Sequence, residues 1–193
     1  MDATYENLQR TIAQASDTQV FTTVVNAPFA HKLEVVKLCL GIIVLLLVDK
    51  QTGLIHRVAL SNTELAAGTK RMSAKKFEEI VVPLDYEENC IAQAIRTGEQ
   101  QCTTDWKYLF APALTAKEAR FNQAGGAIAF SAVHPLPGVG DGGALIFSYY
   151  QYPNKIGEAQ KDFMEHYAAL VAERLSAVPA PLKLARKTLT NTP

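Results

Sequence analysis

The chain has 193 residues, 48% of them hydrophobic, and its 19 basic residues balance its 19 acidic ones. This length suits one domain with a real core, and the apolar fraction argues against a disordered chain. Because the net charge is zero, no overall field attracts nucleic acid or an anionic membrane surface. Composition therefore indicates a globular domain and gives no support to a nucleic-acid-binding protein.

Cysteine usage and hydropathy bear on location and cofactors. The three cysteines, Cys39, Cys90 and Cys102, are widely spaced and form no CxxC pair, so neither a disulfide framework nor a zinc knuckle is expected. The polar N-terminus MDATYENLQRTIAQASD lacks a signal-peptide pattern. The most apolar stretch, residues 35–48, contains Lys37 and is shorter than the ~20 residues that a membrane helix needs. We expect a cytoplasmic protein with no membrane insertion, no metal and no cofactor.

The first part of the chain predicts two helices and a hairpin. Residues 5–16 carry apolar side chains at helical spacing and predict an amphipathic helix. A second helix is expected to begin with a cap at Asn26 and to end at Gly41. The apolar run 42–48 and the stretch 54–61 flank a DKQTG turn. This pattern predicts a hairpin whose first strand is buried on both faces.

The middle of the chain is more polar. Residues 62–82 predict a long connection with a short helix near 73–79, and the basic stretch TKRMSAKK (69–76) is interpreted as a solvated loop. Asn89 is expected to cap a helix that Gly98 ends. A short strand in QQCTTD and one or two helical turns after it complete this region.

The segment GGAIAFSAVHPLPGVGDGGALIFSYYQY (125–152) has two apolar runs around a glycine-rich loop. A phosphate-binding loop needs a helix after its glycines, whereas here a β-rich run follows and GK[ST] is absent. The loop is therefore predicted to join two strands of a second hairpin.

Neither face of this second hairpin is polar, so helices must cover the sheet on both sides. The terminal helices, including a long one at 157–176, are expected on one side and the segments between 62 and 124 on the other. The sequence thus predicts an α+β domain with three layers and a central antiparallel sheet. The tail after residue 176 is expected to be frayed.

This order of elements resembles a GAF domain. The stretch IVVPLDYEENCIAQAIRTGEQQCTTD (80–105) resembles the family's proline-leucine, small helix, "TGE" and strand, and residues 125–151 resemble its final hairpin. The similarity covers residues 27–176, with 1–26 as an N-terminal helix and linker and 177–193 as a C-terminal tail. The resemblance implies a non-enzymatic sensory or regulatory domain that binds a small molecule in signalling.

The resemblance also implies a pocket between the sheet and the crossover helices. Trp106 could stack on a planar ligand or close the pocket, although a core anchor is an alternative. A pocket histidine could bind a ligand or haem, although a half-buried structural histidine is ordinary at a strand end. Mapped element by element, the pocket would be lined by Asn89, Thr103, Asp105, Trp106, Phe110, Ser131 and His134.

Two ligand-binding signatures of GAF domains are absent or misplaced in this sequence, which restricts the ligands to be expected. No Cys-His pair is present for bilin attachment, and the Asn-Lys pair at 154–155 lies after the last strand, away from where cyclic-nucleotide-binding members carry theirs. One alternative is a degenerate GAF module that serves dimerisation or protein docking without a ligand. Another is a thiol-based redox enzyme of the methionine sulfoxide reductase type that uses Cys90 or Cys102.

The redox alternative depends on thiol placement. A helix N-terminus could make Cys90 reactive, but a small buried side chain is the competing interpretation, and Glu87 and Glu88 oppose a thiolate. The predicted helix separates Cys90 from Cys102 by more than ~10 Å, too far for a disulfide. The sequence contains no GxSxG or HExxH motif, so nothing favours an enzyme.

The two terminal helices each carry an apolar stripe. These stripes include Leu8 and Ile12 in the first helix and Phe163 and Tyr167 in the last. Because one sheet face can bury only part of this surface, we expect the remainder to form a homodimer interface.

Overall fold

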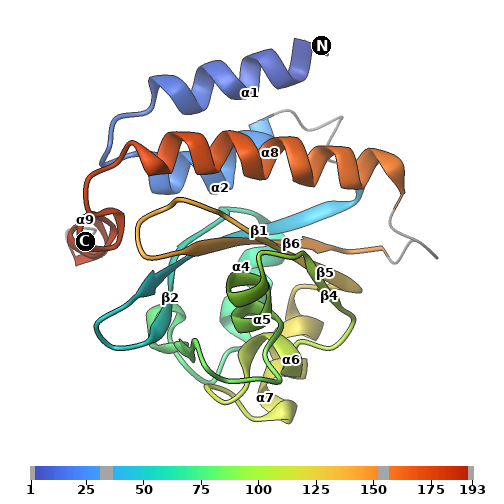
Figure 1. The fold of residues 1–193 in the computed structure, drawn as a ribbon. Helices are drawn as coiled ribbons and strands as arrows, with labels where there is room; N and C mark the ends of the chain where they lie inside the picture. Colours follow the sequence, from blue (N-terminus) through green and yellow to red (C-terminus); the bar gives the residue numbers. More distant parts are fainter. Residues whose placement is uncertain (1–2, 31–36, 152–156, 191–193) are drawn as a thin grey trace.

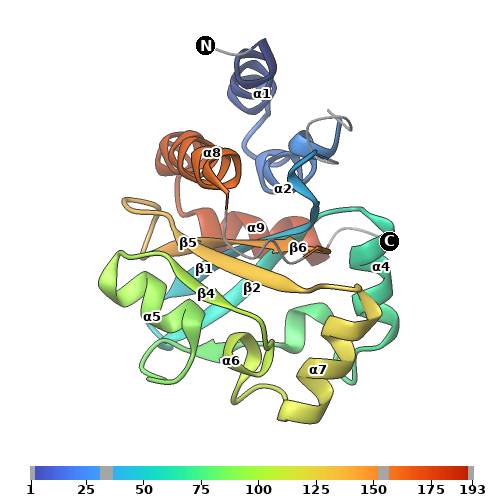
Figure 2. The same cartoon turned by 90° about the vertical axis from the view of Figure 1, so that its right-hand side faces the viewer.

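The computed structural model describes residues 3–30, 37–151 and 157–190, which form three layers. An antiparallel sheet lies between two layers of helices (Figures 1 and 2), and its strand order is β3-β2-β1-β6-β5-β4. The predicted α+β class is therefore confirmed. The strands are β1 (Leu40–Asp49), β2 (Leu54–Leu60), β3 (Val82–Pro83), β4 (Gln101–Thr103), β5 (Phe130–Pro135) and β6 (Gly143–Tyr149).

Helices from the two ends of the chain cover the upper face of the sheet in Figure 1. Their apolar side chains pack with those of Leu45, Phe147 and Tyr149 in a cluster that we call the upper core. The helices of this layer are α1 (Ala3–Gln14), α2 (Val20–Ala30), α8 (Glu158–Ser176) and α9 (Pro181–Thr190).

The segments between the two hairpins cover the opposite face, as the sequence predicts. Val44, Ile91 and Leu109 belong to this second cluster, the lower core. Its layer consists of α4 (Glu64–Arg71), the 3-10 helix η1 (Phe77–Glu79), α5 (Cys90–Thr97), α6 (Lys107–Phe110) and α7 (Ala116–Gly125). Among the described residues, no helix combines the length and the apolar character needed to cross a membrane.

Both predicted hairpins are present. β1 pairs with β2 and β6 at the centre of the sheet, which is why it reads as an uninterrupted apolar run. The GVGDGG loop connects β5 to β6, and Gly138, Gly140 and Gly142 adopt φ values of 77°, 52° and 126° that glycine tolerates best. A strand follows the loop, so the prediction of a turn instead of a phosphate-binding loop is confirmed.

The N-terminal helices differ from the prediction. α2 begins at Val20 rather than at Asn26. Asn26 lies inside this helix, where its side-chain oxygen accepts a hydrogen bond from the backbone N–H of Asn62 at 2.7 Å. Gly41, expected to end the helix, belongs to β1. Residues 31–36 of the expected helix lie outside the described part of the chain.

The connection after β2 is also more regular than predicted. α4 begins after Thr63, whose hydroxyl oxygen accepts from the backbone N–H of Ala66 at 3.2 Å. Residues 69–71 of the basic stretch therefore lie in a helix and not in a loop. The short helix expected near 73–79 is the single turn η1.

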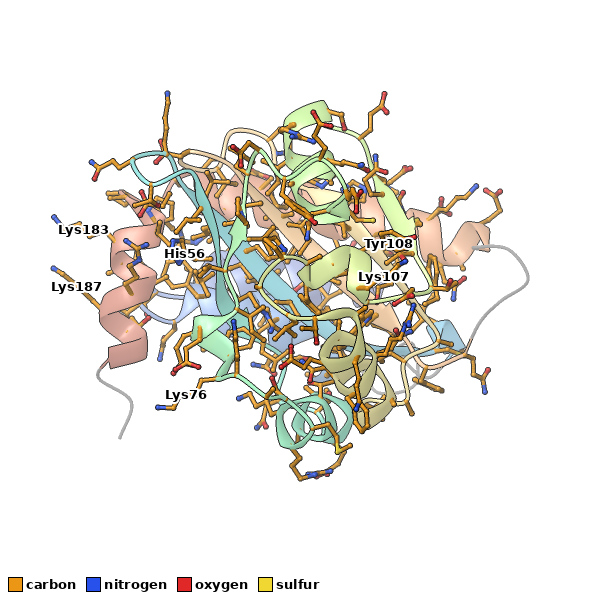
Figure 3. The ribbon with its side chains drawn as sticks, turned by 90° about the horizontal axis from the view of Figure 1, so that it is seen from below. His56, Lys76, Lys107, Tyr108, Lys183 and Lys187 are labelled. Carbon is orange, nitrogen blue, oxygen red and sulfur yellow. The ribbon has the colours of Figure 1, made fainter. Side chains whose placement is uncertain are left out.

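The C-terminal residues are not frayed between 181 and 190. They form α9, which packs on β1 and β2 and buries Ala185 completely. Figure 3 shows Lys183 and Lys187 extending outward from α9, while His56 of β2 lies beside it. α9 thus extends the upper layer over the first hairpin.

Near the start of β5, the side chains do not alternate between the two faces of the sheet as predicted. Ala127 has φ 49°, which interrupts the extended backbone before the strand begins. Consequently Ile128 belongs to the lower core, whereas Phe130 and Ala132 belong to the upper core. For β6 the predicted faces are confirmed, with Leu145, Phe147 and Tyr149 all in the upper core.

Candidate ligand-binding site

Trp106, Phe110 and Ser131 come together in the lower core. Trp106 is 4% exposed, and its indole N–H donates to the Ser131 hydroxyl at 2.8 Å. That hydroxyl lies 2.8 Å from the Ser148 hydroxyl, and the Phe110 ring meets the Trp106 ring edge-on with centroids 5.2 Å apart. These groups satisfy one another, so Trp106 is the core anchor that the sequence left as an alternative.

Asn89 is fully buried and is saturated by its own chain. Its side-chain oxygen accepts from the backbone N–H groups of Ile91 (2.8 Å) and Ala92 (3.1 Å), which confirms the predicted cap of α5. Its amide nitrogen donates to the carbonyls of Leu109 (2.8 Å) and Ala111 (2.9 Å). Asn89 therefore fixes α5 against α6 and has no free group for a ligand.

Thr103 and Asp105 build the turn that leads into α6. The Thr103 hydroxyl donates to the Asp105 carbonyl and accepts from its N–H, both at 3.0 Å. The Asp105 carboxylate accepts from the Lys107 N–H and forms an ion pair with Arg120 at 2.7 Å. This bond to Arg120 holds the pKa of Asp105 below its ordinary value. Both predicted residues thus serve the local fold.

His134 lies apart from the other predicted residues. Alternation along β5 places it with Phe130 and Ala132 on the upper face, whereas Ser131 points to the lower face. Its ring is half-buried, and this burial lowers its pKa. The structure therefore does not bring His134 to a pocket under the sheet.

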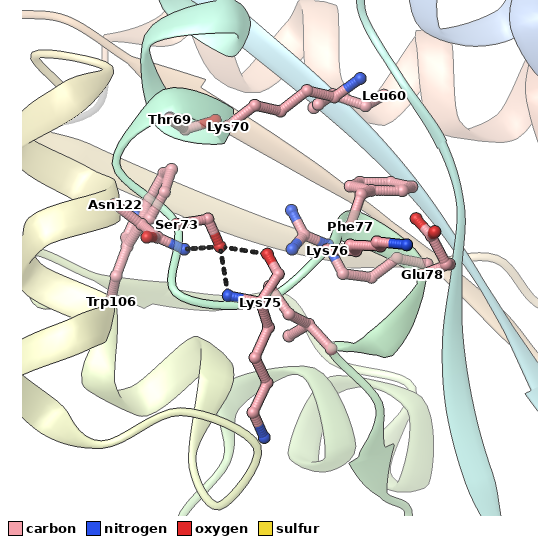
Figure 4. Close-up of a pocket in the computed structure, with 12 residues that line it drawn as sticks. Leu60, Thr69, Lys70, Ser73, Lys75, Lys76, Phe77, Glu78, Trp106 and Asn122 are labelled. Atoms are coloured by element: carbon pink, nitrogen blue, oxygen red, sulfur yellow. Dashed lines mark hydrogen bonds between the residues drawn. The ribbon is translucent and has the colours of Figure 1, made fainter.

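A cavity of about 260 Å³ lies beside Trp106, between β2, α4, η1 and α7 (Figure 4). Of the seven predicted pocket residues, Trp106 alone lines it. The sequence patterns did not predict the other side chains that line it. The most informative of them are Arg57, Leu60, Lys70, Ser73, Phe77 and Asn122.

A bulge in β2 directs two side chains toward this cavity. Leu45 pairs with Ala59 and the next residue of β1, Leu46, pairs with Arg57, which leaves Val58 as an extra residue. In a regular strand, residues three apart point to opposite faces. Here Val58 and Ala59 both belong to the upper core, so Arg57 and Leu60 both reach the cavity below.

Arg57 is buried without an anion. It is 8% exposed, its Nε has no hydrogen-bond partner, and no ion pair to it is found among the described residues. Its guanidinium carbon lies 4.3 Å from the centre of the Phe77 ring and 4.9 Å from that of Phe110. Burial alone lowers the pKa of Arg57 to about 9. The rings contact the cation but leave its buried Nε–H group unsatisfied.

Asn122 of α7 supplies a buried acceptor. Its amide nitrogen donates to the Ser73 hydroxyl oxygen at 3.3 Å (Figure 4), and Ser73 donates its own proton to the Lys75 carbonyl at 2.6 Å. Because that proton is already used, Ser73 must accept from Asn122, which fixes the orientation of the amide. The Asn122 oxygen then has no donor, although the residue is only 3% exposed.

Basic side chains surround the cavity. Arg57, Lys70, Lys75 and Lys76 line it, against the single carboxylate of Glu78. Figure 4 shows the Lys75 side chain extending away from Ser73, and its ammonium group donates to the Ala113 carbonyl at 2.7 Å. Among the described residues, no group of three or more His, Cys, Asp or Glu side chains could hold a metal.

Solved structures with the same arrangement of elements provide an independent comparison. No protein-family model and no curated protein matches this sequence. The GAF domain of an Acinetobacter phosphoenolpyruvate-protein phosphotransferase superposes with a TM-score of 0.59, covering 91% of this chain and 95% of its own, at 12% identity. The chain has a GAF-like fold. At such low identity, the likeness of this GAF-like domain to its neighbours shows the fold alone.

Two further neighbours have different roles. A phycoerythrobilin-bound GAF domain from a cyanobacterial phytochrome has a TM-score of 0.58 at 11% identity, covering 90% of this chain and 95% of its own. Free methionine-R-sulfoxide reductase from Neisseria meningitidis, in complex with its substrate, has a TM-score of 0.54 at 10% identity, covering 95% and 89%. The fold alone therefore does not assign a role to this GAF-like domain.

The thiols of this GAF-like domain show no activation. Burial raises the pKa of Cys90 and of Cys102, so the helix N-terminus does not make Cys90 a reactive thiolate. Cys102 pairs with Ala132 and so shares its upper face, whereas Cys90 packs against the lower core. Both cysteines are free, and they lie on opposite sides of the sheet.

Proposed function

We propose that this GAF-like domain is a non-enzymatic regulatory module that binds a small molecule in the cavity beside Trp106. The supporting observation is that two residues lining this cavity, Arg57 and Asn122, each carry a buried polar atom without a partner, Nε and Oδ1 respectively. Folded proteins pair nearly all such groups, and a bound ligand supplies the missing partners. A cytoplasmic location belongs to the proposal because three free cysteines suit a reducing compartment.

Native mass spectrometry on protein purified from its own host tests the proposal. We expect a co-purified small molecule that is released on unfolding. Leu60→Trp, which fills the cavity from β2, should remove it, whereas Leu54→Trp at the other end of β2 should retain it. Absence of any small molecule from the folded wild-type protein contradicts the proposal.

A degenerate module without a ligand is the second candidate. It is favoured by the predicted pocket residues whose polar groups are already paired within the chain, namely Asn89, Trp106 and Ser131. Such a module would act in dimerisation or docking, and it predicts that no molecule co-purifies. A homodimer through the terminal helices remains a prediction. The thiol-enzyme alternative has the least support because burial raises the pKa of both candidate thiols.

A further inference from the structure

We propose that the ligand of this cavity is a small organic anion that accepts hydrogen bonds from Arg57 and donates one to Asn122. This inference rests on the proposed function and adds the chemical class of the ligand. The class follows from the charge, the unpaired acceptor and the volume of the site.

The charge comes from Arg57. A buried guanidinium without an anion is unfavourable because burial removes hydration, here at Nε, and no hydrogen-bond acceptor replaces it. Phe77 and Phe110 lie against the cation, but ring contacts do not satisfy in-plane N–H groups. A carboxylate or phosphate matches both the charge and the forked donor geometry of arginine. Lys70 and Lys76 at the rim add positive potential that attracts such an anion.

The second contact comes from Asn122, whose oxygen can only accept. The ligand must therefore present an N–H or O–H group in addition to its anionic group. An acid with a hydroxyl or amino substituent has both. An anion without such a group leaves Asn122 unsatisfied and should bind more weakly.

The volume indicates the size of ligand that the cavity can hold. With a water molecule occupying about 30 Å³ of liquid, a cavity of about 260 Å³ corresponds to roughly nine waters. This space suits a molecule of roughly ten non-hydrogen atoms. A hydroxy acid such as malate or a phosphate ester such as glycerol 3-phosphate is of this size. A nucleotide or a bilin is much larger.

The first measurement is the thermal stability of the ligand-free protein. Arg57→Met retains side-chain length and contact with the two rings but removes the unpaired charge. If Arg57 is held for an anion, this variant should melt about 2–4 °C higher than the wild type. If Arg57 is a structural cation that the rings stabilise, the variant should melt lower, and this result overturns the inference.

The second measurement is the shift in melting temperature on adding malate, glycerol 3-phosphate or the uncharged analogue malamide. We expect at least one anion, and not malamide, to raise the melting temperature of the wild type in proportion to the logarithm of its concentration. The shift should be lost in Arg57→Met and reduced in Asn122→Leu. It should persist in Arg96→Met, which removes an exposed arginine of α5. Whether malate or glycerol 3-phosphate raises the melting temperature distinguishes a carboxylate ligand from a phosphate ligand.

Some outcomes contradict an anionic ligand without contradicting ligand binding in the cavity. Equal shifts in wild type and Arg57→Met, or no shift with either anion, contradict the inference. If a neutral or cationic molecule co-purifies at the same time, the proposed function stands and only the ligand class is wrong. If nothing co-purifies and Arg57→Met melts lower, both fail.

Discussion

Two buried asparagines in the lower half of the molecule differ in how fully their polar groups are hydrogen-bonded. Asn89 uses both donors and its oxygen within the chain, across contacts to α5 and α6. Asn122 is nearly as buried but keeps an oxygen without a donor. Burying a polar group is unfavourable unless it is paired, so the first side chain stabilises the fold and the second does not.

This contrast predicts different stabilities for two single variants. Asn89→Ala removes a helix cap and leaves two buried carbonyls without donors, so the free energy of unfolding should fall by about 2–4 kcal/mol. Asn122→Leu removes an amide whose oxygen has no hydrogen-bond donor, and it should change the free energy of unfolding by less than about 1 kcal/mol. Urea denaturation of the ligand-free proteins measures both. Equal losses in the two variants would show that Asn122 is also structural.

Sequence patterns located one of these residues and not the others. Asn89 is predictable because it precedes an apolar helical run, which is where caps occur. Its bonds to Leu109 and Ala111 depend on how two helices meet, which no local pattern encodes. Arg57 was missed because the extra residue Val58 appears only when β2 pairs with β1. A charged residue in the middle of LIHRVALS was the available signal.

At the scale of elements, α9 is held to the first hairpin by a small polar cluster. Arg186 donates to Asp49 and to His56 Nε2, each at 2.9 Å. The second bond requires a neutral imidazole, because only an unprotonated nitrogen accepts. Burial, and next the charge of Arg186, lower the pKa of His56, while Asp49 opposes this effect.

The cluster predicts that α9 detaches at acidic pH. Between the lowered pKa of His56 and its ordinary value of about 6.5, the unfolded chain binds a proton that the folded chain does not. Stability from this group is thus fully present above about pH 6.5 and is lost as the pH falls below it. Hydrogen exchange, corrected for intrinsic rates, should show α9 losing protection relative to α8 between about pH 7.5 and 5.5.

Two histidine variants separate this cluster from a general effect of acid. His56→Gln retains an acceptor for Arg186 without a titratable ring, and should abolish the selective loss at α9. His134 also has a pKa lowered by burial, but it lies on β5, which β6 separates from the β1–β2 hairpin on which α9 packs. His134→Gln should leave the α9 effect unchanged. A parallel loss of protection in α8 and α9 would contradict the prediction.

Two helices that wall the cavity cross at a pair of glycines. A Cβ on Gly68 of α4 would overlap the Gly125 carbonyl of α7, and one on Gly125 would lie 2.6 Å from the Gly68 carbonyl. We expect Gly68→Ala to lower the free energy of unfolding by about 1–3 kcal/mol, because backbone must move. The same displacement should weaken ligand retention, since Asn122 lies on α7. Calorimetry and native mass spectrometry measure the two effects.

Gly157 provides the matched control for this substitution. It precedes α8 with φ −71°, and an added Cβ would meet only the Gln160 side chain, at 3.6 Å. Gly157→Ala should therefore be close to neutral. A comparable loss in both variants would show that the α4–α7 crossing is not the cause.

The elements could be predicted where a strong apolar period or a turn signal marks them. β1, β2, β6 and α8 have such patterns, and they were found close to their observed limits. α4 was missed because glycine and lysine in ELAAGTKR resemble a loop, although Thr63 followed by Glu64 is a start signal. α9 is stabilised by packing on β1 and β2, and such tertiary contacts are not visible in a short polar segment.

In the whole molecule, the upper and lower cores lie on the two faces of one sheet, and the terminal helices bury their apolar side chains in the upper core. Leu8 and Ile12 of α1 are 1% and 0% exposed, and Phe163 and Tyr167 of α8 are buried as well. The large hydrophobic side chains found exposed among the described residues are Met72, Tyr108 and Phe121, none of which is on α1 or α8. Most of the apolar surface from which the homodimer was predicted is therefore buried within one chain, while Tyr5 of α1 and Leu170 of α8 are only partly buried.

This packing gives α1 a measurable role in the stability of a single chain. Burial of Leu8 and Ile12 contributes about 3–6 kcal/mol by area, a large part of the 5–15 kcal/mol typical of a domain. The double variant Leu8→Ala, Ile12→Ala should therefore melt well below the wild type, while Gln9→Ala on the exposed side of α1 should not.

Dilution separates intrachain stability from stability that comes from a dimer. Stability contributed by a second copy falls as protein is diluted, because dissociation is favoured by mass action. Stability contributed by α1 packing on α2 and α8 of its own chain does not depend on concentration. If α1 packing within one chain provides all of this stability, the melting temperature of the wild type stays constant over about a hundredfold dilution, with light scattering recording the mass at each end. A melting temperature that falls on dilution, together with a dimeric mass lost in the double variant, would instead establish the homodimer through these helices.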